Sequence, residues 1–173
     1  MQASEQSQQK FQPANTKLVC AILALAAVVI IGFTAALSID LQMVRSLDPA
    51  DYTETSLENF VYDASVSVEG GKIVITGWGC VAQERIDAVE NDIVLYLPST
   101  GEYFIIPTEM QVTEAANEAL GDGVVDHSES GFYATVWPFQ LEYDLSEYEL
   151  CMSYRTNFKN ALIHTGIYLE VSE

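Results

Sequence analysis

The stretch ASVSVEGGKIVITGWGCV, residues 64–81, decides the fold. Apolar residues alternate with polar or small ones on both sides of Gly70-Gly71, which is the pattern of half-buried strands. Glycine adopts the positive φ angles of a two-residue turn without a steric penalty. The stretch therefore predicts an antiparallel hairpin, with one strand over 64–68 and the next over 72–81.

Five further segments share this alternation, and we expect the loop Pro98-Ser99-Thr100-Gly101 to join two of them in a second hairpin. Thr108 to Leu120 instead contains Glu, Ala, Met and Leu and is followed by Gly121, which favours one short helix crossing between sheets. Seven strands with one crossover predict an all-β fold, an immunoglobulin-like antiparallel β-sandwich. The five further strands are expected over 92–97, 103–106, 132–137, 147–154 and 162–171.

An apolar run of twenty residues without a charge, Leu18 to Leu37, precedes this region. At about 1.5 Å of rise per residue, a helix of that length matches the roughly 30 Å hydrocarbon core of a bilayer. We therefore expect a single transmembrane helix over 18–39. A cleaved secretory signal is the alternative, because Thr34 and Ala36 are small enough for a cleavage site, although the run is longer than signal peptides usually have.

The segments around this helix differ in composition. Residues 1–17 are rich in Gln, Ser and Ala, a composition that predicts a disordered tail. The tail includes Lys10 and Lys17, so the positive-inside bias places it in the cytoplasm. Residues 40–60 have few paired apolar positions and suit a spacer. Residues 61–173 are long enough for one domain with its own core, and we expect that domain outside the cytoplasm of a single-pass protein of the cell membrane.

The chain is strongly acidic, with 25 Asp and Glu, 7 Lys and Arg, and a formal net charge of −18. No basic patch interrupts this charge in the sequence. Nucleic acid and anionic membrane surfaces are therefore disfavoured as partners. Contact with membrane lipid is expected only through the N-terminal helix.

Two segments, GKIVITGW at 71–78 and SGFYATV at 130–136, resemble strands of bacterial envelope immunoglobulin-like β-sandwich accessory modules. Such modules are membrane-anchored and often lie beside glycan-handling enzymes. In them the first segment is a strand ending in a Gly-Trp kink, and the second opens a strand on the opposite side of the core. The resemblance covers about 61–171 and implies a fold and an envelope setting, with no catalytic residues to carry over.

Cys80 and Cys151 lie on the second and sixth expected strands, the two that a sandwich disulfide usually joins. The alternation opposes this bond, because the apolar residues on both sides of Cys151 face the core and leave its sulfur on the other face. A bulge at Gly77 or Gly79 would turn Cys80 to either face. A disulfide thus stays open, with two reduced, partly buried thiols as the default.

Catalytic signatures are absent from the sequence, and its two histidines, His127 and His164, fall in a loop and on the last strand. A zinc site from both histidines with Cys80 and Cys151 would need four distant positions to converge, without the close ligand pairs of zinc modules. Paired carboxylates carry no information among 25 acidic residues. We expect a protein that is not an enzyme and that holds no cofactor.

A Gly-bearing loop, residues 121–129, offers the oxygen ligands that calcium prefers, from Asp122, Asp126 and Glu129. The loop lacks the ligand spacing of an EF-hand, so a plain turn is the favoured interpretation.

Aromatic residues provide the main candidate for a binding surface. Alternation along the last strand places His164 and Tyr168 on the face away from its aliphatic residues, and the third strand turns Tyr96 away from the core in the same way. If those two strands are neighbours, Tyr96, His164 and Tyr168 form a platform. Exposed rings of this kind stack on sugars or anchor a protein partner.

Together these patterns favour a non-catalytic, membrane-anchored, extracytoplasmic binding or scaffolding module of the cell envelope, with an envelope glycan or a membrane protein as its partner. The alternative is an accessory assembly or signalling subunit of a membrane protein complex. Only the small-xxx-small spacing of Gly32 and Ala36 in the apolar run supports helix pairing of that kind.

Overall fold

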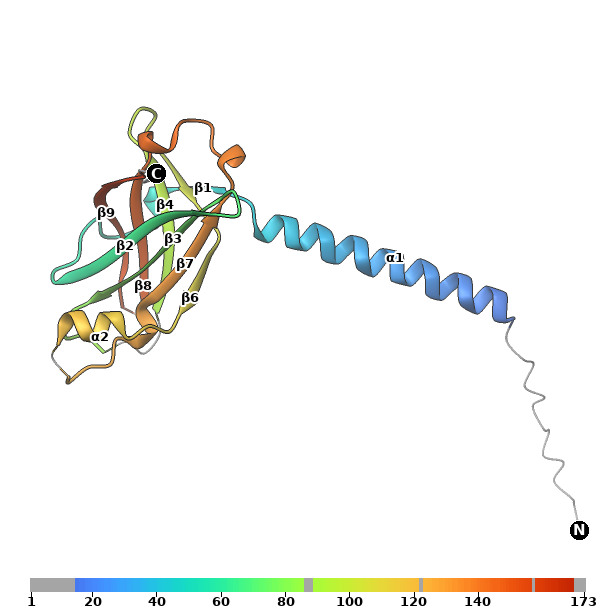
Figure 1. Cartoon of the computed structure of the whole chain (residues 1–173), viewed down its shortest axis with the longest axis horizontal. Coiled ribbons are helices and arrows are strands. Elements are labelled where there is room, and N and C mark those ends of the chain that lie inside the picture. Colours follow the sequence, from blue (N-terminus) through green and yellow to red (C-terminus); the bar gives the residue numbers. More distant parts are fainter. Residues whose placement is uncertain (1–14, 86–88, 122, 157, 170–173) are drawn as a thin grey trace, which may run out of the picture. The chain divides into compact units, whose positions relative to one another are not determined.

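The computed structural model describes residues 15–85, 89–121, 123–156 and 158–169 (Figure 1). The chain divides into two compact units, Met1–Asp40 and Leu41–Glu173. The described part of the first is helix α1 (Thr16–Leu41), whose 26 residues include none that are buried. The helix is long and apolar enough to cross a membrane, and a signal sequence can have the same length and apolar composition. Most of the expected cytoplasmic tail, residues 1–14, lies outside the described residues.

The second unit is mostly β and sandwich-like, with two antiparallel sheets (Figure 1). A five-stranded sheet has the order β1 (Arg45–Leu47), β5 (Glu102–Ile105), β4 (Val89–Leu97), β8 (Glu149–Thr156), β9 (Asn160–Tyr168). A four-stranded sheet has the order β2 (Phe60–Glu69), β3 (Lys72–Val81), β7 (Gly131–Val136), β6 (Thr108–Gln111). The helical segments are α2 (Ala115–Leu120) and the 3-10 turns η1 (Pro49–Asp51), η2 (Ser128–Ser130), η3 (Pro138–Gln140) and η4 (Leu145–Glu147).

The core lies between the inner faces of the two sheets, and every second residue of the central strands contributes to it. Ile73 and Ile75 of β3 pack in one cluster with Leu95 of β4 and with Leu150 and Met152 of β8. These five side chains are fully buried. Since successive residues of a strand point to opposite faces, the residues between them face outward from the sandwich.

Both expected hairpins are present. Glu69 pairs with Lys72 across Gly70-Gly71, whose φ angles of 57° and 84° are the positive values that this turn requires. The loop 98–101 joins β4 to β5, with Leu97 paired to Glu102 and a φ of 78° at Gly101.

The structure corrects the expected spacer over 40–60. Arg45–Leu47 forms β1 at the edge of the five-stranded sheet, where it pairs with β5. Glu54 makes an isolated bridge to Ala161, and the Tyr52 hydroxyl donates to the hydroxyl of Ser153 at 2.9 Å. A strand of three residues is too short to show a period, so the sequence carries no signal for it.

The expected helix over 108–120 is also corrected. Its first part is strand β6, which pairs with β7, and only Ala115–Leu120 is helical. Gly121 ends this helix as expected, with a φ of 61° and its N–H donated to the carbonyl of Asn117. The chain changes sheets earlier, between β5 and β6, so α2 links two strands of the same sheet. Pairing with β7 has outweighed the local helical composition of 108–111.

Cys80 and Cys151 are both reduced thiols, and they lie on opposite outer faces of the sandwich. The pairing of β3 with β2 runs without a shift, so no bulge turns Cys80 inward; it packs with Trp78 and Ala116 beneath α2. Cys151 packs with Val94 on the outer face of the other sheet. The core layer separates the two sulfurs, which rules out the disulfide in this fold.

Candidate functional site

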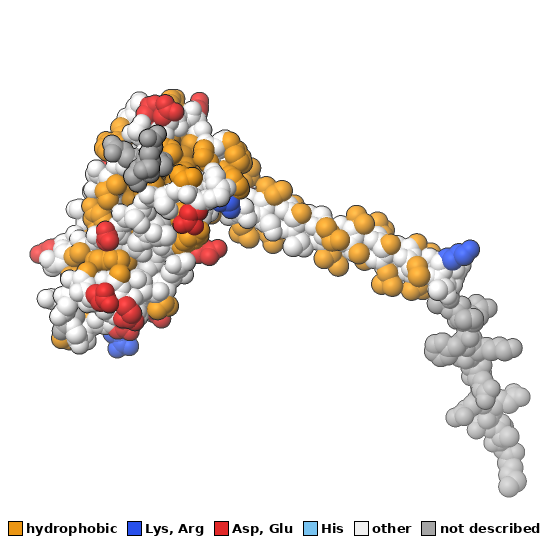
Figure 2. Space-filling view, in the orientation of Figure 1, with side chains coloured by type: hydrophobic (Ala, Val, Ile, Leu, Met, Phe, Trp, Pro, Cys, Tyr) orange, Lys and Arg blue, Asp and Glu red, His pale blue; other side chains and the backbone are white. Residues whose placement is uncertain are grey.

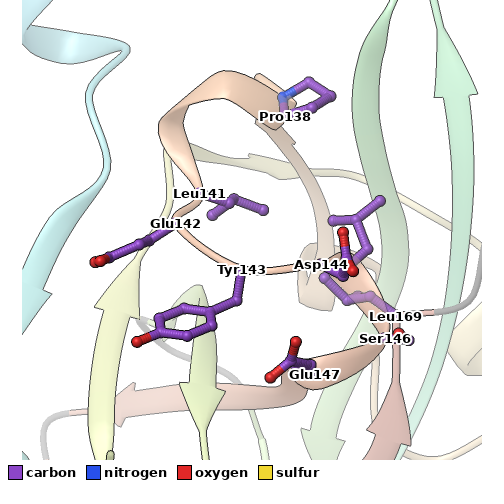
Figure 3. A pocket seen from close by; sticks show the side chains of 9 residues that line it. Pro138, Leu141, Glu142, Tyr143, Asp144, Ser146, Glu147 and Leu169 are labelled. Carbon is purple, nitrogen blue, oxygen red and sulfur yellow. The ribbon is translucent and has the colours of Figure 1, made fainter.

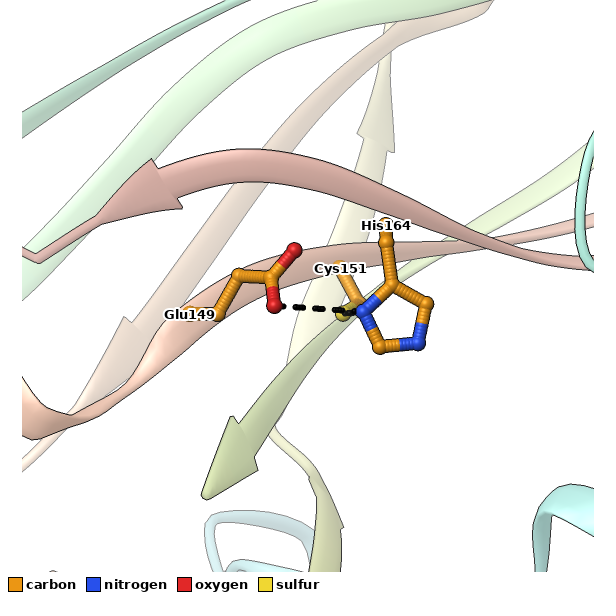
Figure 4. A group of neighbouring side chains, drawn as sticks. All are labelled: Glu149, Cys151 and His164. Atoms are coloured by element: carbon orange, nitrogen blue, oxygen red, sulfur yellow. Dashed lines mark hydrogen bonds and ion pairs between the residues drawn. The ribbon is translucent and has the colours of Figure 1, made fainter. Parts of the chain in front are cut away.

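Three side chains with metal-binding atoms meet on the outer face of the five-stranded sheet: Glu149, Cys151 and His164 (Figure 4). Leu150 of β8 packs into the core, so Glu149 and Cys151 on either side of it point outward. His164 is the ladder partner of Cys151 in β9, which places its ring over the same patch.

Short distances link this cluster. His164 Nδ1 lies 3.2 Å from Glu149 Oε2 and 3.4 Å from Cys151 Sγ. On the other side of the ring, the Tyr103 hydroxyl lies 3.2 Å from His164 Nε2. Both imidazole nitrogens are therefore engaged, one by the cluster and one by a tyrosine of β5.

A bulge in β9 fixes the position of the Glu149 carboxylate. Leu150 pairs with Ile167 and Cys151 with His164, so two extra residues stand in β9 between these pairs. One of them is Gly166, which has a φ of 71° and donates its backbone N–H to Glu149 Oε1 at 3.0 Å. A glycine reaches this φ without strain, and the bulge thereby aims a backbone donor at the carboxylate.

Two tyrosines hold the imidazole in place. Tyr96 and Tyr103 are ladder partners, and their rings stack with centroids 4.5 Å apart. His164 meets both edge-on, at 5.0 Å from Tyr96 and 5.8 Å from Tyr103. Aromatic contacts of this geometry are favourable beyond the area they bury.

Burial decides the chemistry of the thiol. Cys151 is fully buried, Glu149 is 8% exposed, and the His164 side chain is 37% exposed. Burial, followed by the nearby charge of Glu149, raises the pKa of the Cys151 thiol far above its usual value. Because the thiolate is the nucleophilic form, Cys151 is unreactive at neutral pH unless a cation replaces its proton. Burial also raises the pKa of Tyr103, which keeps that hydroxyl neutral.

The expected aromatic platform is only partly assembled. Tyr96 and His164 do meet, although β4 and β9 are not neighbours: β8 lies between them. Tyr168 pairs with Glu149 on the same sheet face and is 47% exposed. Tyr103 joins the cluster and was missed by the sequence analysis. The loop 98–101 carried a signal for it, because pairing Leu97 with Glu102 places Tyr103 opposite Tyr96.

The four-residue zinc site considered from the sequence does not form. Cys80 lies beneath α2, and His127 is fully buried next to η2, while Cys151 and His164 meet on the other sheet. Within the described ranges, Glu149, Cys151 and His164 are the one group of three such residues close enough to share a metal ion.

The calcium prediction remains untested, because Asp122 lies outside the described residues. Asp126 Oδ1 accepts hydrogen bonds from the Ser128 backbone at 2.9 Å and from Asn117 Nδ2 at 3.1 Å. These bonds, the first above all, lower the pKa of the Asp126 carboxyl. Glu129 and Asp126 line a hollow that Arg85 also lines. In this loop the Asp126 carboxylate thus accepts hydrogen bonds from residues of the loop and of α2.

A second surface feature is the segment between β7 and β8, which walls a shallow hollow of about 970 Å³ (Figure 3). Leu141, Leu145 and Leu169 are among the apolar residues that line it, and Glu142, Asp144 and Glu147 are the acidic ones. In the same segment Trp137 stacks on Phe139, which is 80% exposed.

Comparisons with family models, with curated proteins and with solved structures find no match to this chain. Of the features that the sequence led us to expect, the structure shows the pair of antiparallel sheets and the apolar N-terminal helix.

Proposed function

We propose that this chain is a non-catalytic binding module that its N-terminal helix holds in the cell envelope, with an immunoglobulin-like sandwich outside the cytoplasm that recognises a glycan. The observation that carries the proposal is the aromatic face of the five-stranded sheet, defined as Tyr96, Tyr103, His164 and Tyr168. The first three rings contact one another, and Tyr168 extends the same face. Rings held rigidly at a surface suit stacking on sugars.

Charge narrows the ligand class. Acidic side chains are spread over the second unit (Figure 2), within a chain of net charge −18. Such a surface repels anionic polymers, so a neutral or basic polysaccharide is the glycan class that fits.

The anchor is supported by α1, which is long and apolar enough to cross a membrane. None of its 26 residues is buried within the protein, so its apolar side chains are available to contact lipid.

The test uses the full-length protein in detergent, incubated with immobilised neutral, basic and anionic envelope polysaccharides. We expect retention on a neutral or basic polysaccharide, and its loss in Tyr96→Ala and Tyr168→Ala. Tyr143→Ala is the matched control, because Tyr143 is an exposed tyrosine that lies away from the aromatic face and lines the hollow beside the segment between β7 and β8. Retention that survives both face variants overturns the proposal.

The same preparation separates the competing function. Cross-linking of intact cells before extraction, followed by mass spectrometry, shows what stays with the chain. A stoichiometric membrane protein together with no glycan retention replaces the proposal with an accessory subunit of a membrane complex.

A further inference from the structure

The cluster of Glu149, Cys151 and His164 has three different donor atoms in one place, an oxygen, a sulfur and a nitrogen, all within 4.8 Å of one another. A solvated acidic patch would offer oxygen alone. Hard cations such as calcium take six or more oxygen ligands, whereas zinc accepts oxygen, nitrogen and sulfur in one shell. The donor set thus selects a borderline metal ion.

Two of the three distances between ligand atoms are close to the edges of a zinc tetrahedron. With Zn–S of about 2.3 Å and Zn–N of about 2.05 Å, a tetrahedral centre separates its sulfur and nitrogen by about 3.6 Å and its nitrogen and oxygen by about 3.4 Å. The observed separations are 3.4 Å for Cys151 Sγ to His164 Nδ1 and 3.2 Å for His164 Nδ1 to Glu149 Oε2. These two separations need to grow by only about 0.2 Å each, and the third pair, Cys151 Sγ with the Glu149 carboxylate, lies within 4.8 Å.

Neighbouring groups orient two of the three ligands. A metal at His164 Nδ1 needs the proton on Nε2, and the Tyr103 hydroxyl at 3.2 Å is placed to accept it. Glu149 receives the Gly166 N–H at 3.0 Å on Oε1, which leaves Oε2 directed at the cluster. Second partners of this kind fix the tautomer and direction of metal ligands in proteins.

We propose that Glu149, Cys151 and His164 bind one Zn²⁺ on the outer face of the five-stranded sheet. Binding forms a Zn–S bond as the Cys151 S–H proton leaves to solvent, and the thiolate and carboxylate charges balance the charge of the ion. Three protein ligands leave a fourth position, which water fills on the solvent side beside His164. The proposal goes beyond the glycan-binding function and does not depend on it.

The experiment titrates metal-free full-length protein in detergent with Zn²⁺ alone, in competition with a chromophoric chelator, under a reducing agent that does not bind metal. We expect one equivalent to bind with a dissociation constant of micromolar or below. Co²⁺ in place of Zn²⁺ should give the thiolate-to-cobalt charge-transfer absorption of a sulfur ligand in a tetrahedral site.

Variants assign the site. Cys151→Ser should weaken Zn²⁺ binding at least about 100-fold and remove the cobalt–sulfur band, and His164→Ala should weaken binding by a similar factor. Tyr103→Phe should weaken it about 10-fold, within the range for second partners of metal ligands. Cys80→Ser is the matched control, because Cys80 is also fully buried on an outer face yet lies outside the cluster, and it should bind as the native chain does.

Failure to bind Zn²⁺ below millimolar concentration, or binding that Cys151→Ser and His164→Ala leave unchanged, overturns the proposal. If Cys151→Ser does not fold, His164→Ala decides alone, since the His164 side chain is 37% exposed whereas Cys151 is fully buried. Loss of the cobalt band in Cys80→Ser would also contradict the assignment.

Discussion

The two buried cysteines lie under covers of different kinds. Cys80 on the four-stranded sheet packs with Trp78, Ala116 and Leu120, so helix α2 closes an apolar layer over it. Cys151 on the five-stranded sheet packs with Val94, Leu162 and partly buried tyrosines, and its Sγ also lies 3.4 Å from Nδ1 of His164, which contacts Glu149. Both thiols are 0% exposed. Two equally buried thiols thus have different neighbours: Cys80 lies beside Trp78 and residues of α2, whereas Cys151 lies beside two other side chains with metal-binding atoms.

We expect the largest loss of stability from a substitution on the outer face of the four-stranded sheet, which α2 covers. Trp78→Ala removes a large buried side chain from beneath α2 and should lower the free energy of unfolding by about 3–5 kcal/mol. Tyr96→Ala on the polar face should cost less, because Tyr96 is half-buried. Denaturant unfolding of the two variants in detergent measures both. Equal losses of stability would show that the side chains around Cys151 are packed as tightly as those around Cys80.

The second prediction concerns the carboxylate of Glu149 on the outer face of the five-stranded sheet. Glu149→Ala leaves the Gly166 N–H and the His164 ring without their acceptor, which should cost about 1–3 kcal/mol of stability. Glu149→Gln keeps an oxygen for the Gly166 N–H and should cost clearly less in the same unfolding measurement. If the two variants are equally stable, the carboxylate does not hold the bulge.

A smaller effect is expected from the tyrosine hydroxyl. Tyr103→Phe keeps the stacked ring but removes the contact with His164 Nε2, which should cost at most about 1 kcal/mol at this half-exposed position. The clearer readout is the imidazole itself, because its nitrogen chemical shifts report the tautomer in NMR spectra. An unchanged tautomer balance would mean that Tyr103 does not select it.

The smallest effect concerns the loop that follows α2. Because the folded pKa of Asp126 lies below its unfolded value of about 3.8, its contribution to stability is present above that pH and is lost as the pH falls through the folded pKa. Asp126→Asn should therefore melt slightly earlier than the native chain at neutral pH and equally at strongly acidic pH. Thermal melting from pH 7 to 2 checks this. A difference that persists at the acid end would assign the effect to something other than the charge.

The alternation of apolar and polar residues predicted which side chains lie on the outer face of the five-stranded sheet. Alternation around Cys151 correctly placed its sulfur on the side away from the core, and the same rule turned Tyr96 and His164 outward. What the pattern did not reveal was their contact, because β8 lies between β4 and β9 and the register of β8 with β9 sets which residue of β9 faces Cys151. A shift of one residue in that register would place a different side chain over the thiol.

The sequence by itself determined the features that arise from short-range physics. A run of uncharged residues forms α1, paired glycines form the first hairpin turn, and Gly121 ends α2, because chain length, polarity and φ preferences act within a few residues. Only the tertiary structure decided that Arg45–Leu47 and Thr108–Gln111 become edge strands and that Glu149, Cys151 and His164 meet. Those outcomes depend on which distant backbones share hydrogen bonds, and strand pairing between distant segments leaves no period in the local sequence.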